Sequence, residues 1–236
     1  MVTAAGSPLP LRSGGWSRVT QRLWETWEAR VDPRRLRRRF PELANYENQS
    51  RELTDKLRPV YEEYVASIST PDSAISLELA ALALILCWIR RPRRILDLGS
   101  GFSSWVFRYY QAQAQPAPEI WSVDDDPHWL EQTRRFLSTH QFPVSYLENW
   151  QDFAEAHQAP FDFILHDLGS MALRQAALPR VVALADHRAL LLLDDVQKHP
   201  YGPYARQLLH NMHLETFNLK FLVRDQFRRY AFLVLT

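Results

Sequence analysis

The sequence predicts an α/β protein with a seven-stranded sheet of five parallel strands and a C-terminal antiparallel hairpin, helices on both faces and an N-terminal helical extension. The parallel part follows from short apolar runs that alternate with stretches of helical length from about residue 93 onward. The hairpin follows from two further strand-like runs whose connection, Arg224–Arg228, is too short for a crossover helix. The 236 residues, 46% of them hydrophobic, supply one sizeable core but hardly two full domains.

The N-terminal part of the chain differs from the rest in composition. Residues 1–15 are rich in Gly, Pro, Ser and Ala, which predicts a mobile tail. Residues 16–71 carry many charges with apolar residues at helical spacing, which predicts an extension of amphipathic helices. The main domain is expected at 72–236. The helices of the extension are expected to break at Pro33, Pro41 and Pro59.

An apolar helix is predicted at about 72–90, with Ser69, Thr70 and Asp72 as candidate caps at its start. Its apolar stretch, Leu77–Ile89, is shorter than the roughly 20 residues of a membrane-spanning helix, so we expect a buried core helix. The N-terminus has no apolar stretch typical of a signal peptide. The single cysteine excludes a disulfide framework. These features predict a cytoplasmic protein that does not associate with membranes.

The elements of the main domain follow in order along the chain. The predicted strands are Arg94–Leu98, Ile120–Asp124, Val144–Leu147, Phe161–His166, Ala189–Asp194, Glu215–Val223 and Arg229–Leu235. The predicted helices between them are Ser103–Gln113, Pro127–His140, Trp150–Gln158, Met171–Ala185 and Tyr201–His213. No internal repeat is visible in this order.

A glycine turn joins the first predicted strand to its helix, in the run Asp97-Leu98-Gly99-Ser100-Gly101-Phe102-Ser103-Ser104. Gly99 and Gly101 allow the backbone to turn tightly and to approach a ligand closely. The free N–H groups at the start of the helix can bind an anion or a carboxylate, and the hydroxyls of Ser103 and Ser104 add donors. The alternative is a turn whose small residues serve packing alone.

Acidic residues end the second predicted strand, in the run Val123-Asp124-Asp125-Asp126-Pro127. Asp124 lies about 20 to 30 positions after the glycine turn, where a carboxylate can accept hydrogen bonds from both hydroxyls of a ribose. Asp125, beside it, is a further candidate for the same site. Asp126 precedes Pro127 and is expected to cap the next helix. The glycine turn and Asp124 together predict a nucleoside-binding site.

These two motifs resemble those of class I S-adenosylmethionine-dependent methyltransferases, whose sheet is Rossmann-like. The run Asp97–Gly101 looks like the family's acidic-x-Gly-x-Gly motif, and Val123-Asp124 looks like its strand-two acidic motif. Ser104 stands where a dinucleotide-binding turn has its third glycine, which disfavours pyrophosphate. The resemblance covers about residues 72–236 and implies S-adenosylmethionine as the cofactor. The implied cofactor-binding residues are Asp97, Gly99, Ser100, Gly101, Ser103, Ser104, Asp124, Asp125 and Asp167, with Asn149 and Trp150 near the adenine.

A second acidic group ends the fourth and fifth predicted strands, where Asp167 follows one strand and Asp194 and Asp195 close the other. Neighbouring strands lie about 5 Å apart, so the three carboxylates should meet in the crevice where open α/β sheets bind ligands. They would repel one another unless a cation lay between them, and Mg²⁺ or Ca²⁺ suits all-oxygen ligands. The alternative is that these residues only cap helices and turns.

This second group is similar to that of the catechol and caffeoyl-CoA O-methyltransferase branch. The resemblance implies a metal held by Asp167, Asp194 and Asp195, which orients the hydroxyls of the methyl acceptor. Two departures are that Asp195 stands where the branch has Asn, and Ser170 stands where it has Lys. The catalytic base is therefore open. The candidates are Asp167, His166, Lys198 and His199.

The sequence thus predicts an enzyme that transfers a methyl group from S-adenosylmethionine to an oxygen of a small molecule. Two alternatives are methylation of RNA or protein through the basic run Arg34–Arg39, and a cofactor-binding scaffold without activity. The net charge is only +1 and acidic residues surround the basic run, so a solvated helix face or a subunit contact is favoured over nucleic acid. Trp16, Trp24 and Trp27 are candidates for a homo-oligomer contact.

Overall fold

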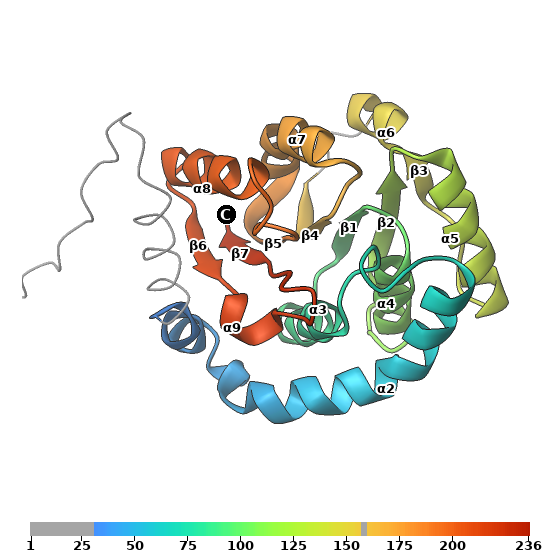
Figure 1. Ribbon diagram of the computed structural model, residues 1–236, viewed down its shortest axis with the longest axis horizontal. Coiled ribbons are helices and arrows are strands. Elements are labelled where there is room, and N and C mark those ends of the chain that lie inside the picture. Colours follow the sequence, from blue (N-terminus) through green and yellow to red (C-terminus); the bar gives the residue numbers. More distant parts are fainter. Residues whose placement is uncertain (1–30, 157–159) are drawn as a thin grey trace, which may run out of the picture.

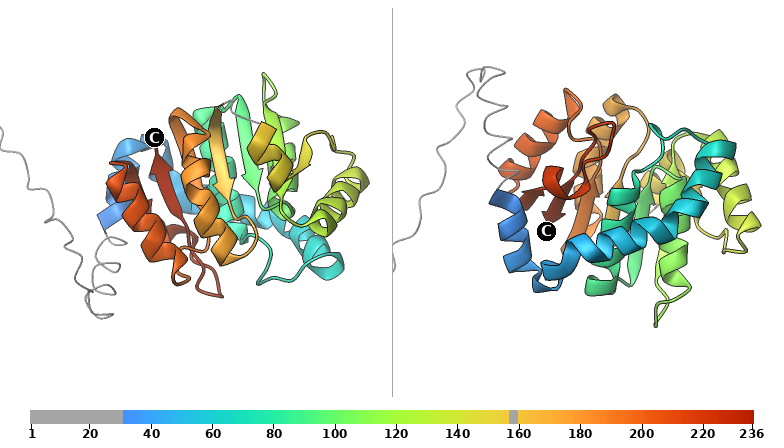
Figure 2. Two further views of the ribbon diagram at one scale, coloured as in Figure 1. Left: turned by 90° about the horizontal axis from the view of Figure 1, so that it is seen from above. Right: turned by 60° about the horizontal axis from the view of Figure 1, so that its bottom comes forward.

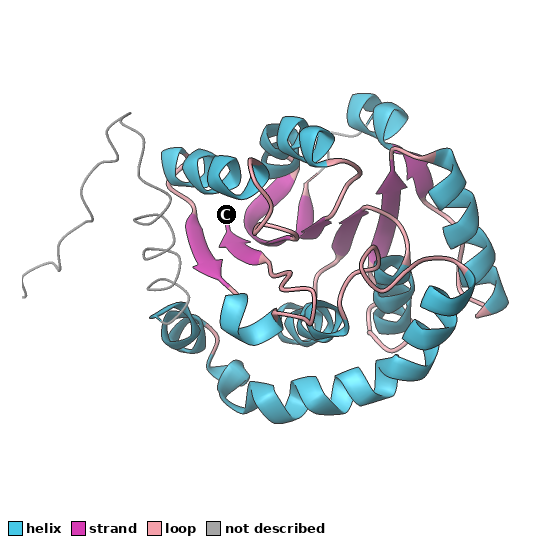
Figure 3. Cartoon of the chain, in the orientation of Figure 1, coloured by secondary structure: helices cyan, strands magenta, loops and turns pink. Residues whose placement is uncertain are grey.

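The computed structural model describes residues 31–156 and 160–236, which fold around a seven-stranded sheet (Figures 1 and 3). The strand order is β3-β2-β1-β4-β5-β7-β6; β1 to β5 are parallel, and β7 is antiparallel to β5 and to β6. The predicted five parallel strands and antiparallel hairpin are confirmed. The strands are β1 Arg94–Leu98, β2 Glu119–Asp124, β3 Leu147–Asn149, β4 Phe161–His166, β5 Ala185–Leu193, β6 Glu215–Asn218 and β7 Phe232–Leu235.

Helices cover both faces of the sheet. α3 and α4 lie on one face, α7 and α8 lie on the other, and α2 forms an outer layer packed against α3 (Figures 1 and 2). Residues 31–39 are also helical. The other helices are the 3₁₀-helix η1 Pro41–Asn45, α2 Tyr46–Ser67, α3 Leu77–Arg90, α4 Phe102–Gln111, α5 Pro127–Thr139, α6 Trp150–Ala156, α7 Met171–Ala183, α8 Tyr201–Asn211 and α9 Lys220–Val223.

The apolar helix α3 is the core helix that the sequence predicts. Within residues 31–156 and 160–236, no helix is both long and apolar enough to cross a membrane. The helix begins later than expected, because its cap is Ser76, whose Oγ accepts from the N–H of Leu79 at 3.2 Å. The predicted caps Ser69, Thr70 and Asp72 lie instead in the segment before the helix. That segment contributes to the candidate site described below.

The proline breaks expected in the extension occur only in part. Pro41 begins η1, but Pro33 lies within helical residues and Pro59 lies inside α2. Pro59 removes the hydrogen bond to the carbonyl of Asp55, and both residues are exposed, so water can satisfy that carbonyl. The predicted tail at 1–15 and the three tryptophans at positions 16, 24 and 27 lie outside the described residues.

Five predicted strands have different bounds in the structure. The second begins one residue earlier, at Glu119, the fifth is Ala185–Leu193 rather than Ala189–Asp194, and the seventh begins at Phe232 rather than Arg229. The third strand begins at Leu147 rather than Val144, because Tyr146 has a φ of 58° and cannot extend it. The sixth strand ends at Asn218 rather than Val223. There the Asn218 side-chain oxygen accepts from the N–H of Lys220 at 3.0 Å and starts the short helix α9.

The extension is tied to the hairpin by charged side chains. Asp32 is buried and accepts from the N–H of Asn218 at 2.7 Å. Arg35 and Arg39, from the basic run, lie 3.5 and 3.8 Å from the carboxylate oxygens of Glu215. Arg37 pairs with Glu47. These arginines are about half exposed, so each pair contributes at most about 1 kcal/mol, but together they place the run against β6 and α2.

Candidate functional site

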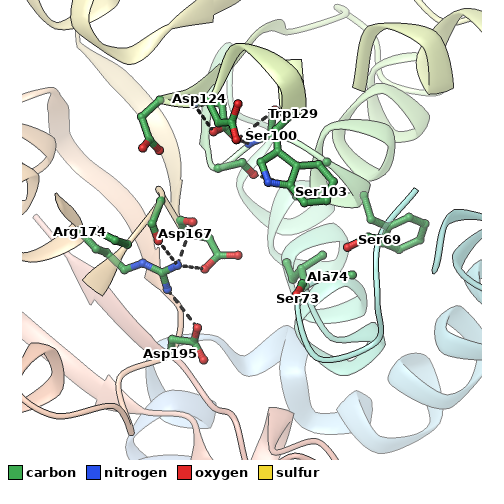
Figure 4. A pocket seen from close by; sticks show the side chains of 18 of the residues that line it. Ser69, Ser73, Ala74, Ser100, Ser103, Asp124, Trp129, Asp167, Arg174 and Asp195 are labelled. Carbon is green, nitrogen blue, oxygen red and sulfur yellow. Dashed lines mark hydrogen bonds and ion pairs between the residues drawn. The ribbon is translucent and has the colours of Figure 1, made fainter. Parts of the chain in front are cut away.

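A cavity of about 570 Å³ opens at the carboxyl ends of β1, β2, β4 and β5 (Figure 4). Its lining comes from the loops after these strands, from the end of α2 and from the segment before α3, and many of the lining residues are polar. The volume lies within the range of small-molecule sites. The position is the one at which open α/β sheets bind ligands.

The glycine turn forms one wall of the cavity. Gly99 and Gly101 have φ values of 99° and 153°, which disfavour other residues. A Cβ atom at Gly99 would lie 2.4 Å from the carbonyl oxygen of Asp167, and one at Gly101 would lie 2.6 Å from the hydroxyl oxygen of Tyr64. At Gly99 the contact is with backbone that cannot move aside, and at Gly101 the positive φ disfavours a side chain, so the turn favours glycine at both positions.

Asp124 closes β2 and fastens the glycine turn. Its Oδ2 accepts from the Ser100 N–H at 2.7 Å and from the Ser100 hydroxyl at 3.1 Å, and its Oδ1 accepts from the Asp126 N–H at 3.0 Å. Asp124 lines the cavity although it is only 4% exposed, and this burial raises its pKa to about 6. A carboxylate has about four acceptor positions, so Asp124 can still accept from a ligand hydroxyl.

The two aspartates that follow Asp124 make different contacts. Asp126 caps α5, accepting from the His128 N–H at 2.8 Å, as predicted. Asp125 is exposed and lines the cavity. A Cβ atom at Gly169 would lie 2.3 Å from the Asp125 Oδ1, so this carboxylate reaches the loop after β4.

Asp97 and Ser104 lie beneath the turn and not on the cavity wall. Both are fully buried, and the Asp97 Oδ2 accepts from the hydroxyls of Ser104 at 2.5 Å and Ser122 at 3.1 Å. Arg108, also buried, donates to the Ser122 hydroxyl at 2.8 Å. Desolvation raises the pKa of Asp97 to about 6. These two predicted cofactor contacts therefore support the turn from below, whereas Ser103 does line the cavity.

The structure does not bring Asn149 and Trp150 to the cavity. The Asn149 side-chain oxygen accepts from the N–H of Gln151 at 2.9 Å, and the buried Trp150 ring stacks on Phe153 with centroids 6.3 Å apart. Asn149 ends β3 and Trp150 begins α6, and neither lines the cavity. An aromatic residue that does line the cavity near Asp124 is Trp129, in the first turn of α5.

The acidic residues after β4 and β5 come together as predicted, but an arginine lies among them (Figure 4). Nη2 of the buried Arg174 lies 2.6 Å from the Asp167 Oδ1, and its Nη1 lies 3.3 Å from the Asp195 Oδ2. The Lys198 ammonium lies 2.6 Å from the same Asp195 oxygen. Although burial opposes it, the hydrogen bond from Lys198 holds the pKa of Asp195 below its usual value.

Asp194 occupies the least accessible position of the group. It is 4% exposed and does not line the cavity, and its Oδ1 accepts from the N–H of Asp195 at 2.7 Å. Burial, with Asp167 and Asp195 nearby, raises its pKa well above the usual value. A carboxyl group in this position is protonated more readily than an ordinary aspartate.

The arrangement does not fit a divalent metal ion. Within residues 31–156 and 160–236, no group of three or more His, Cys, Asp or Glu side chains is placed so that it could hold one. The cation that three neighbouring carboxylates require is present as the Arg174 guanidinium. The negative charge of this acidic group is therefore offset by an arginine and a lysine of the chain itself.

Two of the candidate bases lie away from the cavity. His166 is fully buried on the other side of β4, with its Nε2 3.0 Å from the carbonyl oxygen of Arg174. Burial lowers its pKa to about 3, so the ring is neutral and donates to this carbonyl. His199 is exposed and also lies off the cavity wall. Asp167 and Lys198 are the candidates that line the cavity.

Two buried arginines at the site carry almost no signal in the sequence. Arg174 belongs to no motif; the only signal is its place in the first turn of a helix that begins just after Asp167. Arg229 donates to the carbonyl oxygens of Pro71, Asp72 and Ala74 at 2.9, 2.7 and 2.8 Å. It thereby fixes the segment before α3 at the edge of the cavity.

The chain matches no family model and no curated protein, but its fold is similar to that of several solved structures. The O-methyltransferase from Bacillus cereus in complex with SAH has a TM-score of 0.57 and 14% identity, over 77% of this chain and 91% of that one. TomG, an O-methyltransferase from Streptomyces achromogenes in complex with SAM, has a TM-score of 0.54 and 15% identity, over 73% and 85%. SAH-bound methyltransferase PaMTH1 from Podospora anserina has a TM-score of 0.55 and 13% identity, over 98% and 100%.

These likenesses confirm the predicted fold. The chain has a Rossmann-like fold similar to that of these methyltransferase structures, with five parallel strands and the terminal antiparallel hairpin.

Proposed function

We propose that this protein transfers a methyl group from S-adenosylmethionine to an oxygen atom of a small molecule. The observation that carries the proposal is the Asp124 carboxylate, which lines the cavity beside a turn that favours glycine at two positions. A carboxylate at the end of β2 suits the hydroxyls of a ribose. The structural neighbours described as bound to SAM or SAH add support.

The residues around the cavity fit this cofactor. The volume of about 570 Å³ suits a nucleoside with an amino-acid side chain attached. Asp124 has acceptor capacity for the ribose, and the hydroxyls of Ser69 and Ser103 lie on the wall for the polar groups of the methionine portion. Trp129 offers an aromatic surface on the same side.

S-adenosylmethionine, when bound, supplies a methyl group that is already activated, so the main task of the protein is alignment. Asp167 and Lys198 also line the cavity, where an acceptor hydroxyl would be oriented. We assign to Asp167 the removal of the hydroxyl proton, because its carboxylate is held in place by Arg174.

A small acceptor is favoured over RNA. Arg35, Arg37 and Arg39 of the basic run are engaged with Glu47 and Glu215, which leaves this surface partly neutralised. Binding of nucleic acid by a neutralised surface would be weak.

The test is calorimetry with S-adenosylhomocysteine, NAD and ATP. We expect S-adenosylhomocysteine to bind and Asp124→Ala to weaken its binding at least tenfold, since each charge-assisted hydrogen bond contributes about 1.5–3 kcal/mol. Asp124→Asn, which keeps an acceptor for Ser100, should have a smaller effect. Asp152→Ala, at an exposed position of α6, is the matched control and should bind normally. Unchanged affinity in a folded Asp124→Ala protein, or binding of NAD instead, would contradict the proposal.

A further inference from the structure

Arg174 occupies the place where the resemblance to metal-assisted O-methyltransferases puts a divalent cation. It extends from the first turn of α7 to the ends of β4 and β5 (Figure 4). Its two terminal nitrogens pair with Asp167 at 2.6 Å and with Asp195 at 3.3 Å. Since Arg174 is only 4% exposed, water screens these ion pairs little.

Backbone carbonyls hold the guanidinium in this position. Its Nε donates to the carbonyl oxygen of Leu168 at 3.3 Å, and its Nη2 donates to those of Asp167 at 3.0 Å and Gly169 at 3.4 Å. All three nitrogens of the group are therefore engaged. A buried arginine with its donors satisfied is a fixed part of the site, because leaving it unpaired would be costly.

The carboxylates are occupied in turn. The Asp195 Oδ2 accepts from Arg174 and, at 2.6 Å, from Lys198, while its Oδ1 accepts from the side-chain amide of Gln197 at 2.7 Å. A divalent ion on the same oxygens would have to displace these donors and would lie close to a guanidinium of like charge. The carboxylates are thus already paired with cations of the chain itself, and Arg174 is the buried one.

We infer that Arg174 is the resident cation of this site and that the site works without a divalent metal. The inference rests on the proposed function for one point, which is that Asp167 faces the methyl acceptor. Arg174 acts through Asp167, whose carboxylate it orients and neutralises, and it is therefore a positioning residue.

Thermal unfolding with magnesium or calcium chloride, or with EDTA, tests the inference without any acceptor. The wild-type protein should melt within about 1 °C of the same temperature in all three, since no metal binds its native state. Arg174→Gln should lower the melting temperature by roughly 6 to 20 °C, because it leaves buried carboxylates without their partner. Millimolar Mg²⁺ should then restore part of that loss.

Arg180→Gln is the matched control. Arg180 lies on the same helix and donates to the carbonyl oxygen of Ala154, away from the acidic residues. The melting temperature of Arg180→Gln should not change with Mg²⁺, whether or not the substitution destabilises the protein. A change with Mg²⁺ that occurs only in Arg174→Gln therefore reports the loss of a charge partner and not a general loss of packing. If Arg174→Gln does not fold, Arg174→Lys and Asp194→Asn replace it. Lysine should retain part of the stability. Asp194→Asn should not lower the melting temperature, because Asn keeps an acceptor for the Asp195 N–H and replaces a group whose ionised form is disfavoured at this position.

Two results would overturn the inference. One is a saturable rise in the melting temperature of the wild-type protein with Mg²⁺ or Ca²⁺ that EDTA reverses. The other is a folded Arg174→Gln protein with the wild-type melting temperature. S-adenosylhomocysteine binding, measured in parallel, should be equal in Mg²⁺ and in EDTA. Its complete absence would remove the proposed function, while the melting experiment would still decide the role of Arg174.

Discussion

The buried carboxyl group of Asp97, beneath the glycine turn, contributes to the pH dependence of the free energy of unfolding. Asp97 is fully buried, and among the described residues its Oδ1 has no hydrogen-bond partner. Its pKa is raised from 3.8 to about 6 by desolvation. Between these values the folded protein retains a proton that the unfolded chain has released. The contribution of Asp97 to the free energy of unfolding therefore falls as pH rises from about 4 to 6.

Asp97→Asn should remove this dependence. The free energy of unfolding of the variant, relative to that of the wild-type protein, should increase by about 3 kcal/mol between pH 4 and pH 7, which corresponds to a shift of about two pKa units. Urea unfolding at a series of pH values measures the difference. Parallel pH profiles for the two proteins would show that Asp97 titrates normally.

Single residues also show what the sequence can and cannot predict. The positions of Gly99, Gly101 and Asp124 on the cavity wall were predictable from the sequence. A tight turn, a close approach and a strand end each impose local requirements on the backbone. Arg174 and Arg229 were not predictable, because their partners are brought together only by the tertiary fold. For His166 the sequence is sufficient, because neighbours in sequence on a strand point to opposite faces, which separates its side chain from that of Asp167.

At the scale of elements, the segment before α3 depends on one side chain of the hairpin connection. The Arg229 guanidinium donates to three carbonyl oxygens of this segment, from Pro71, Asp72 and Ala74, and pairs with Asp225 at 2.6 Å. The segment has little regular structure of its own, so these hydrogen bonds determine where it lies.

Arg229→Gln should loosen this segment. We expect faster hydrogen exchange at residues 71–76, a lower melting temperature and weaker S-adenosylhomocysteine binding, since hydrogen bonds of a charged group contribute about 1.5–3 kcal/mol. Exchange mass spectrometry and calorimetry measure the effects. Arg228→Gln, at an exposed neighbouring position, should behave as the wild-type protein. Unchanged exchange at 71–76 in the Arg229 variant would show that other contacts place the segment.

Among the elements, long periodic segments were predicted well and chain reversals were not. The core strands and α3 follow from apolar runs, which burial forces into the sheet and against it. The shifted start of β3 and the early end of β6 depend on the backbone at Tyr146 and on the side chain of Asn218. The predicted domain boundary at residue 72 stays a prediction.

At the scale of the whole molecule, the extension is attached by one buried carboxylate and several exposed ion pairs. Asp32→Ala should cost about 1–3 kcal/mol, because it leaves the buried N–H of Asn218 without its acceptor. Changing Arg37, Arg38 and Arg39 together to Gln should cost about 1 kcal/mol or less per pair lost, since these side chains are solvated. Denaturant unfolding compares the two variants.

Cofactor affinity should be unaffected by the triple arginine change. A steep loss of RNA binding in that variant, with a strong dependence on salt, would instead favour the alternative acceptor.

The position of Tyr64 couples the outer helix α2 to the cavity. This residue belongs to α2, yet it contacts the rings of Phe102 and Phe136 and closes the cavity over Gly101. An occupant that reaches this wall therefore touches the outer helical layer as well as the loops at the end of the sheet. By linkage, an occupant that favours this closed wall must tighten the docking of α2, and a loosened α2 must release the occupant by the same factor.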